Sequence, residues 1–279
     1  MSEVRRTIAR PVSLTGVGLH LGHRCRLTFE PAAPSAGIGF RRSDRPSASR
    51  IPALAERAVL TERRTQLGEG DEAVHTVEHV LSAAAGMGID DLTIAMDAPE
   101  PPILDGSAAP FVEALERAGL IGHDGMPGYL DVHEPITVVD GDSVYEAHPA
   151  PSLELEVMID FPHPLIGEQA GRWVVTPELY ARELAPARTF GFVHEVEMLR
   201  AKGLIRGASV DNAVVLDAAG VVGNRLRWPD EFVRHKAMDC VGDLALAGRR
   251  VRARVVAVRP SHRGTVLLVR ELSAALARR

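Results

Sequence analysis

Three residues of metal-binding type share one face of a segment near the C-terminus, Phe232–Leu246 (FVRHKAMDCVGDLAL). At about 100° per residue in an α-helix, His235, Asp239 and Asp243 fall within roughly 80° of one another. The opposite side carries apolar residues, Ala237, Val241 and Leu244. An imidazole and a carboxylate at i and i+4 can reach one divalent ion, because both side chains lie over the same turn. The alternative interpretation is a solvent-exposed face with an i,i+4 ion pair, which is common on helices.

A second segment, Ala73–Ala83 (AVHTVEHVLSA), offers a further nitrogen ligand in His79, with Glu78 beside it. Adjacent helical residues point about 100° apart, so one can bind a metal while the other acts as a base, as in zinc hydrolases with HExxH helices. His79, His235 and Asp239 together make three ligands and leave a fourth position for water, which is typical of catalytic zinc. Zinc lowers the pKa of such a water from about 15.7 to near 7 and can polarise a carbonyl.

The same segment also contains an H-x-x-E-H string, the signature of inverzincin metallopeptidases. On this alternative, a zinc metallopeptidase would bind its metal through His75, His79 and a downstream Glu. The helix expected here begins at Thr76, which leaves His75 outside the regular turn. The alternative also gives no role to the stripe of His235, Asp239 and Asp243, so that stripe discriminates between the two hypotheses.

The composition excludes several classes of protein. Lys plus Arg number 32 against 37 Asp plus Glu, and no basic block stands out, so we expect no nucleic-acid partner. No apolar run approaches the roughly 18 residues that span a bilayer, and residues 1–10 contain no apolar signal-peptide core. Cys25 and Cys240 are far apart and form no CxxC, which indicates a reducing compartment. We therefore expect a cytoplasmic protein without a transmembrane segment.

Three helices are predicted to position these residues. Apolar residues at helical spacing predict a helix over Thr76–Ala85, with Thr76 as its N-cap. A second helix is predicted over Ala109–Ala118, where Gly119 stops it, and a third over Asp230–Ala247.

Strands and a linker complete the predicted organisation. Apolar or alternating runs predict strands at Cys25–Phe29, Leu92–Met96, Pro135–Val139, Leu153–Phe161 and Val251–Val258. The type of the segment after the last of these strands is left open. Two glycines and a proline make His123–Gly128 the best candidate for a linker. Because the order of elements recurs after it, we expect two α+β domains, 1–126 and 127–279, each a sheet with helices on one face.

Several strings of the sequence, taken in order, resemble motifs of one family, the zinc-dependent UDP-3-O-acyl-N-acetylglucosamine deacetylases of lipid A biosynthesis. They are TGVGLH at Thr15–His20, HTVEH at His75–His79, LDGSAAPF at Leu104–Phe111, IDFPHP at Ile159–Pro164, ARTFGF at Ala187–Phe192, GASVDNAVV at Gly207–Val215 and DEFVRHKAMDCVGDL at Asp230–Leu244. The likeness runs nearly end to end, so it is more specific than any single motif. In that family a small polar residue is common at the position of His75, which indicates that the H-x-x-E-H match is accidental.

The resemblance implies a role for each residue around the metal. The zinc ligands that it implies are His79, His235 and Asp239. Glu78 is implied as the general base toward the attacking water. His262, in the string PSHRG, matches the family's candidate general acid, and Asp243 would orient it or pair with its charge. Thr189 matches the residue whose hydroxyl helps to hold the tetrahedral oxyanion, and Lys236 matches one that contacts substrate near the metal.

The resemblance also implies the reaction and the substrate-binding residues. The reaction is hydrolysis of the N-acetyl group of UDP-3-O-acyl-N-acetylglucosamine, with release of acetate. Asp160 and Phe161 fall where the family receives the uracil end, and Arg259 stands where some members have a Lys near the diphosphate. Phe190 and Phe192 belong to a βαβ insertion near residues 190–215 that forms an apolar passage for the acyl chain.

The implied fold is a sandwich of two βααβ-type domains with helices packed between two sheets. The first domain would carry Glu78 and His79, and the second His235, Asp239 and His262. We expect one catalytic Zn²⁺, for which Fe²⁺ can substitute because it accepts the same nitrogen and oxygen ligands. The expected partner is the UDP-sugar lipid precursor, and the expected state is a monomer.

Overall fold

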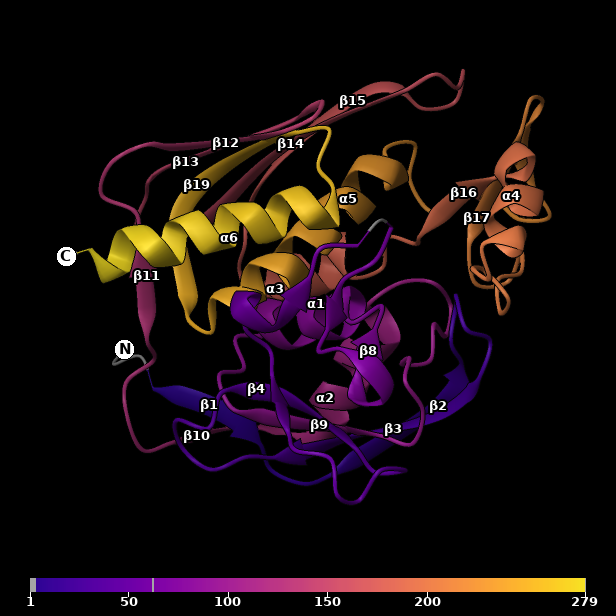
Figure 1. The fold of residues 1–279 in the computed structure, drawn as a ribbon. Helices are drawn as coiled ribbons and strands as arrows, with labels where there is room; N and C mark the ends of the chain where they lie inside the picture. The colour runs from indigo at the N-terminus through magenta and orange to yellow at the C-terminus, as the bar shows by residue number, and fades with distance from the viewer. Residues whose placement is uncertain (1–3, 62, 279) are drawn as a thin grey trace.

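Two β-sheets face each other across a layer of helices in the computed structural model, which describes residues 4–61 and 63–278 (Figure 1). The upper sheet in Figure 1 comes from the second half of the chain and the lower sheet from the first half. Each sheet buries one face against the helices, which is how an α+β protein forms a single apolar layer between two sheets. The expected α+β sandwich with helices between two sheets is therefore confirmed.

The first sheet has the strand order β2-β3-β9-β4-β5. Its strands are β2 (Val12–Val17), β3 (Arg24–Pro31), β4 (Ile38–Arg42), β5 (Ile51–Pro52) and β9 (Leu92–Met96). Strand β9 runs antiparallel to β3 and parallel to β4. In β3, Cys25, Leu27 and Phe29 are buried while the residues between them are more exposed, the alternation of a strand with one covered face. Strands β3 and β9 confirm the first two predicted strands.

The second sheet repeats this topology with the order β12-β13-β19-β14-β15. Its strands are β12 (Ile136–Asp140), β13 (Ser143–Pro149), β14 (Leu153–Phe161), β15 (Gly167–Val174) and β19 (Arg250–Val258), and β11 (Tyr129–Asp131) pairs with the start of β19. Strand β19 runs antiparallel to β13 and parallel to β14, as β9 does in the first sheet. The three strands predicted in this half are confirmed. The division into domains 1–126 and 127–279 stays a prediction.

The helices of the middle layer also correspond between the halves. They are α1 (Glu78–Gly86), α2 (Ala109–Ala118), α5 (Glu231–Leu244) and α6 (His262–Ala277). Helices α1 and α5 each precede the central strand of their sheet, and they pack directly on each other. At their crossing, a Cβ on Gly242 would lie 2.1 Å from the backbone oxygen of Glu78, so only glycine permits this close approach. The segment left open by the sequence is helix α6, which Ser261 caps through the backbone N–H of Gly264 at 3.0 Å.

Smaller elements surround this frame. They are the sheet of β1 (Arg5–Ile8) and β10 (Leu120–His123), the sheet of β6 (Ala58–Val59), β7 (Gln66–Leu67) and β8 (Val74–His75), the sheet of β16 (Phe190–Phe192), β17 (Val214–Asp217) and β18 (Gly220–Val222), and the helices α3 (Pro177–Leu179) and α4 (Val196–Ala201). Short 3₁₀ turns cover residues 55–57, 70–72, 193–195 and 245–247, and a π-helical turn covers residues 180–184. Strands β16 and β17 are parallel with α4 between them, so the insertion is a βαβ unit, and it projects from one side (Figure 1).

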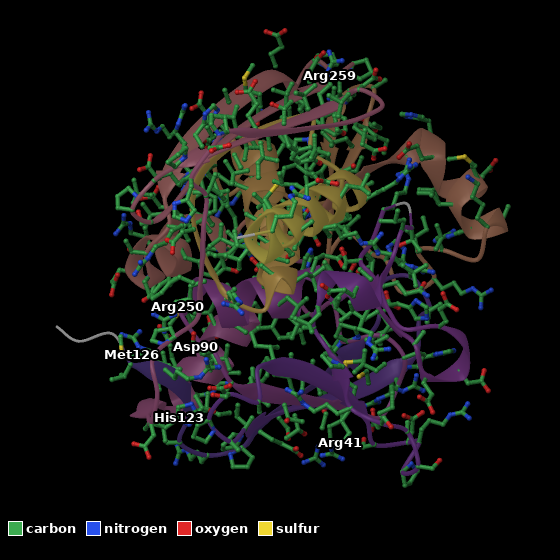
Figure 2. All side chains as sticks on the ribbon, turned by 60° about the vertical axis from the view of Figure 1, so that its left-hand side comes forward. Arg41, Asp90, His123, Met126, Arg250 and Arg259 are labelled. Carbon is green, nitrogen blue, oxygen red and sulfur yellow. The ribbon has the colours of Figure 1, made fainter. Side chains whose placement is uncertain are left out.

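Ion pairs beside the linker join the two halves. Arg250 at the start of β19 donates to both carboxylate oxygens of Asp90, at 2.9 and 2.7 Å (Figure 2). The neighbouring Asp91 is fully buried and accepts two hydrogen bonds from Arg5, each of 2.7 Å. The ring of His123 lies 2.8 Å from the same carboxylate. The Arg250–Asp90 pair thus joins the two halves, and His123 ties the start of the predicted linker, which connects β10 with β11, to the first half.

The start of α1 corrects one prediction. Thr76 is not an N-cap, because the helix begins at Glu78 and Thr76 has a left-handed φ of +54°. Its hydroxyl instead donates to Glu100 Oε1 at 2.7 Å. The carboxylate of Glu100 is fully buried and also accepts the backbone N–H groups of His20 and Leu21. A buried carboxylate needs hydrogen-bond donors, and this explains why the Thr76 hydroxyl bonds to Glu100 instead of capping the helix.

Candidate metal centre

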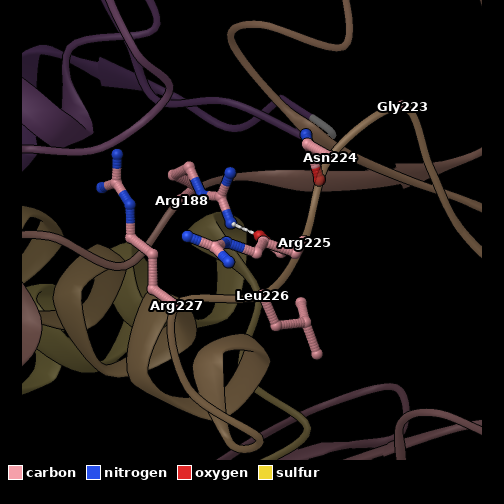
Figure 3. A pocket seen from close by; sticks show the side chains of 6 residues that line it. All are labelled: Arg188, Gly223, Asn224, Arg225, Leu226 and Arg227. Carbon is pink, nitrogen blue, oxygen red and sulfur yellow. Dashed lines mark hydrogen bonds between the residues drawn. The ribbon is translucent and has the colours of Figure 1, made fainter.

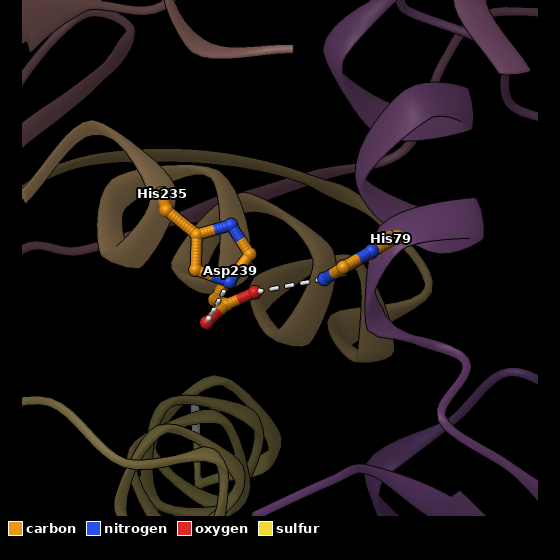
Figure 4. A group of neighbouring side chains, drawn as sticks. All are labelled: His79, His235 and Asp239. Carbon is orange, nitrogen blue, oxygen red and sulfur yellow. Dashed lines mark ion pairs between the residues drawn. The ribbon is translucent and has the colours of Figure 1, made fainter. Parts of the chain in front are cut away.

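The three proposed ligands, far apart in the sequence, converge where α1 meets α5 (Figure 4). His79 Nε2 lies 3.6 Å from Asp239 Oδ1, and His235 Nε2 lies 3.5 Å from Asp239 Oδ2. All three residues are buried, so the interpretation of the stripe as a solvent-exposed face is wrong. Ligand atoms held about 2.0–2.2 Å from a tetrahedral zinc lie roughly 3.3–3.6 Å apart. The observed separations fit that geometry.

The protonation of these residues also suits a metal. His235 Nδ1 donates to the backbone oxygen of Ala187 at 3.2 Å, which leaves the lone pair of its Nε2 directed toward Asp239. Burial lowers the pKa of His235, and burial together with His235 lowers the pKa of His79 to about 3, so both rings are neutral at pH 7. Burial raises the pKa of Asp239, but its neighbours His235 and Lys236 outweigh this effect and hold the pKa below its usual range.

Two imidazole nitrogens therefore face one carboxylate in a buried space, and His79 Nδ1 has no hydrogen-bond partner among the described residues. Separations of 3.5–3.6 Å are too long for hydrogen bonds. Within the described residues, Asp239 Oδ1 is buried without any hydrogen-bond partner. Buried lone pairs repel one another unless a cation lies among them, and this donor set is one that Zn²⁺ accepts. The three residues therefore form a candidate metal site.

A candidate base and a candidate acid flank the ligand set. His262 Nδ1 lies 2.8 Å from Asp243 Oδ2, to which it donates. On the other side of its ring, His262 Nε2 lies 3.9 Å from Glu78 Oε1 and 3.9 Å from Asp239 Oδ2. Glu78 is the first residue of α1 and His262 the first residue of α6, so two helix starts bring them together. Both side chains face the space beside the ligand atoms.

Their pKa values are displaced in the directions that a base and an acid require. Burial raises the pKa of Glu78 to about 7, although His262 and the backbone N–H of Thr65 oppose this rise. Burial lowers the pKa of His262, but the carboxylates of Asp243 and Glu78 outweigh burial and raise it to about 9. Glu78 thus ionises near neutral pH while His262 still holds its proton. This ordering is the one that acid–base catalysis uses.

Thr65 is a site residue that the sequence did not reveal. It is buried and lies directly before β7. Its backbone N–H donates to Glu78 Oε2 at 2.9 Å, and its hydroxyl donates to Asp243 Oδ1 at 2.5 Å. One residue therefore orients both the candidate base and the partner of the candidate acid. Neither periodicity nor a motif of the sequence distinguishes this threonine from the others.

The expected substrate-binding residues form two groups. Phe161 contacts Phe190 and Phe192 with ring centroids 5.3 and 6.0 Å apart, and Phe190 contacts the ring of His235 at 6.0 Å. These three phenylalanines thus form an aromatic cluster that reaches the metal site. Asp160 and Arg259 are exposed and pair with each other, with Arg259 Nη2 2.6 Å from Asp160 Oδ2.

Lys236 contacts a proposed ligand directly, and Thr189 lies two residues after Ala187 on the segment that contacts another. Lys236 Nζ donates to Asp239 Oδ2 at 2.8 Å, and the Asp239 carboxylate raises the pKa of Lys236 although burial opposes this rise. Thr189 follows closely on Ala187, whose oxygen holds His235, and its backbone N–H donates to Gly106 O at 2.8 Å. His75 lies on β8, and the ligand group found among the described residues does not include it. The metallopeptidase alternative is therefore not favoured.

A buried set of two histidines and one aspartate, flanked by a base and an acid in an α+β sandwich, defines a metal-dependent hydrolase. The chain belongs to the LpxC family, whose model, described as UDP-3-O-acyl N-acetylglycosamine deacetylase, matches residues 5–274. Several relatives carry the name UDP-3-O-acyl-N-acetylglucosamine deacetylase, two of them from Myxococcus xanthus and Thermosynechococcus vestitus. The one from Myxococcus xanthus is 44% identical over 96% of this chain and 86% of its own length. The one from Thermosynechococcus vestitus is 43% identical over 98% of this chain and 95% of its own length.

A third relative combines two activities in its name. The bifunctional enzyme LpxC/FabZ from Chlorobaculum tepidum is 39% identical over 96% of this chain and 64% of its own length.

Among the described residues, no helix combines the length and the apolar character that crossing a membrane requires.

Proposed function

We propose that this chain removes the N-acetyl group of a UDP-3-O-acyl-N-acetylglucosamine and releases acetate, a step of lipid A biosynthesis. The observation that carries the proposal is the buried convergence of His79, His235 and Asp239, at separations too long for hydrogen bonds, next to Glu78 and His262. Membership of the family named for this reaction supports the choice of substrate.

The proposed metal is zinc, held by His79, His235 and Asp239, and Fe²⁺ accepts the same ligands. The metal, when bound, supplies a Lewis acid for the acetyl carbonyl and lowers the pKa of water. The second ring nitrogen of His235 is fixed by a carbonyl, which is how proteins set the tautomer of a metal-binding histidine. Lys236 reduces the negative charge of Asp239 and is proposed to contact substrate beside it.

Glu78 and His262 divide the proton transfers. We assign Glu78 Oε1 to take a proton from the attacking water, while Thr65 fixes the other oxygen of the carboxylate. His262 begins protonated and donates from Nε2 to the leaving amine, because Asp243 stabilises its charge through Nδ1. The Thr189 hydroxyl is assigned to stabilise the oxyanion of the tetrahedral intermediate.

The substrate-binding assignments follow the aromatic cluster outward from the metal. Phe190 and Phe192 are proposed to begin an apolar passage for the acyl chain, which the contact of Phe190 with His235 supports. Asp160 and Phe161 are proposed to receive the uracil end. Arg259 is proposed to meet the diphosphate, and its pairing with Asp160 holds the guanidinium near that end.

The state and location of the protein are part of the proposal. A monomer is supported because one chain supplies the whole ligand set together with the base and the acid. A cytoplasmic location is supported by Cys25 and Cys240, which are both buried and free, as in proteins of reducing compartments.

Acetate release from UDP-3-O-acyl-N-acetylglucosamine tests the function. We expect turnover by the purified chain, loss of turnover after chelation, and recovery on adding one equivalent of Zn²⁺ or Fe²⁺. Turnover that survives complete removal of metal, or a metal-loaded protein that releases no acetate, would contradict the proposal.

A further inference from the structure

The tautomer of His235 depends on a backbone atom. Its Nδ1 donates to the oxygen of Ala187, which is itself fully buried, so no water can take the place of this acceptor. A shift of the backbone at residue 187 would free Nδ1 and allow the proton to move to Nε2. Nε2 would then carry a proton instead of the lone pair that faces Asp239. Whatever holds Ala187 in place therefore affects how tightly His235 can bind a metal.

The next residue, Arg188, is fixed by several contacts. Its Nε donates to Glu231 Oε1 at 2.8 Å, and its Nη2 donates to Glu231 Oε2 at 3.0 Å and to the backbone oxygen of Arg225 at 2.7 Å. Its backbone N–H also donates to Glu231 Oε1, at 3.2 Å. Figure 3 shows the bond to the Arg225 oxygen, beside a pocket of about 930 Å³. Arg188 is thus held through both its side chain and its backbone.

The other partner, Glu231, belongs to the helix that carries the ligand. Glu231 stands four residues before His235 on α5, so both side chains lie on the same face, one turn apart. Its carboxylate is fully buried and also accepts the backbone N–H of Arg227 at 2.6 Å. Two residues on consecutive turns of α5 therefore contact two consecutive residues of one segment. Glu231 accepts hydrogen bonds from Arg188, and His235 donates one to Ala187.

We propose that Arg188 and Glu231 are positioning residues that hold the Ala187 carbonyl at His235 and so keep Nε2 of His235 free for the metal. This inference rests on the proposed function, in which His235 is a ligand. We call the Arg188–Glu231 pair the clamp. The residue after Arg188, Thr189, is also held in place. Its backbone N–H donates to Gly106 O and its oxygen accepts from the backbone N–H of Val214, each at 2.8 Å. The segment is therefore also fixed directly after Arg188.

The zinc affinity of the folded protein tests the clamp. Arg188→Lys keeps the charge but loses the paired geometry, and Glu231→Gln keeps the shape but loses the charge. Arg5→Lys is the matched control, because Arg5 forms two hydrogen bonds of 2.7 Å with the fully buried Asp91 in the first half of the chain. By chelator competition, we expect both clamp variants to bind zinc about 10–100-fold more weakly, the range for residues that orient metal ligands. We expect Arg5→Lys to bind zinc as the wild type does.

Equal zinc affinity of the clamp variants and Arg5→Lys would overturn the proposal. If either clamp variant does not fold, ¹⁵N NMR of the metal-free wild type tests the proposal instead. The proposal requires His235 to be protonated at Nδ1, and protonation at Nε2 would overturn it. Neither measurement uses the deacetylation reaction. A wild type that binds zinc but releases no acetate would refute the proposed function and leave the clamp to be judged by its own results.

Discussion

The Asp243→Asn substitution removes the carboxylate that accepts the Nδ1 proton of His262 while it keeps the shape of the side chain. In the wild type, Asp243 accepts from His262 through Oδ2 and from the Thr65 hydroxyl through Oδ1. An amide has one oxygen for these two donors, so at least one of the two bonds is lost. The charge that stabilises protonated His262 is lost in either orientation of the amide.

The size of the effect follows from the causes of the pKa shift. Burial lowers the pKa of His262, and Asp243 is the largest of the groups that raise it to about 9. Without Asp243, we expect the pKa to return to about 6.5, its ordinary value, a fall worth about 3 kcal/mol. At pH 8 the protonated fraction would fall from about 0.9 to about 0.03, and at pH 6 it would change by less than about twofold. A bound metal changes the pKa of His262 alike in the wild type and in Asp243→Asn, so the difference in pKa between the two proteins persists.

The rate of acetate release between pH 5.5 and 10, at saturating zinc, measures this difference. We expect a bell-shaped profile for the wild type, because Glu78 must lose its proton and His262 must keep one. In Asp243→Asn the alkaline limb should move about 2.5 units toward lower pH, with a rate about 30-fold below that of the wild type at pH 8. Asp230→Asn is the control, because it removes a partly exposed charge from the start of the same helix. An alkaline limb that stays in place would refute His262 as the acid.

Three further substitutions test other parts of the account. Glu78→Gln should lower the rate about 10²–10⁴-fold while zinc analysis still finds one ion per chain, and loss of zinc would make Glu78 a ligand instead of the base. His75→Ala should leave zinc content and rate within about twofold of the wild type, whereas loss of zinc would revive the metallopeptidase alternative. Gly242→Ala should lower the free energy of unfolding by about 1–3 kcal/mol in urea and weaken zinc binding, because the new Cβ would lie 2.1 Å from Glu78 O and push α1 from α5. Gly191→Ala is the control for this substitution, since a Cβ there meets nothing within 4 Å, and equal stability of the two variants would contradict the argument.

Periodicity predicted most of the frame because it reports which face of an element is covered. The alternation in β19 and the stripe of His235, Asp239 and Asp243 on α5 both follow from spacing along one element. Glu231 was within reach of the same reasoning, since it lies one turn before His235 on the same face. Spacing along α5 does not reveal the role proposed for it, because the partner, Arg188, lies on another segment.

Contacts between segments distant in the sequence were beyond this reasoning. Thr65 meets Glu78 and Asp243 only because the residue before β7 packs against the start of α1 and the C-terminal end of α5. Thr76 has the chemistry of an N-cap, yet the buried carboxylate of Glu100 takes its hydroxyl. A propensity describes what a residue can do locally, and tertiary contacts decide between its options.

The coordination of one bound zinc ion tests the central claim most directly. X-ray absorption at the zinc edge of the loaded protein should show only nitrogen and oxygen neighbours, at about 2.0–2.2 Å, with two imidazoles among them. The stoichiometry should be one zinc per chain, and His235→Ala and Asp239→Ala should each lose that ion. Sulfur in the first coordination sphere, or full zinc content in both variants, would contradict the site between α1 and α5.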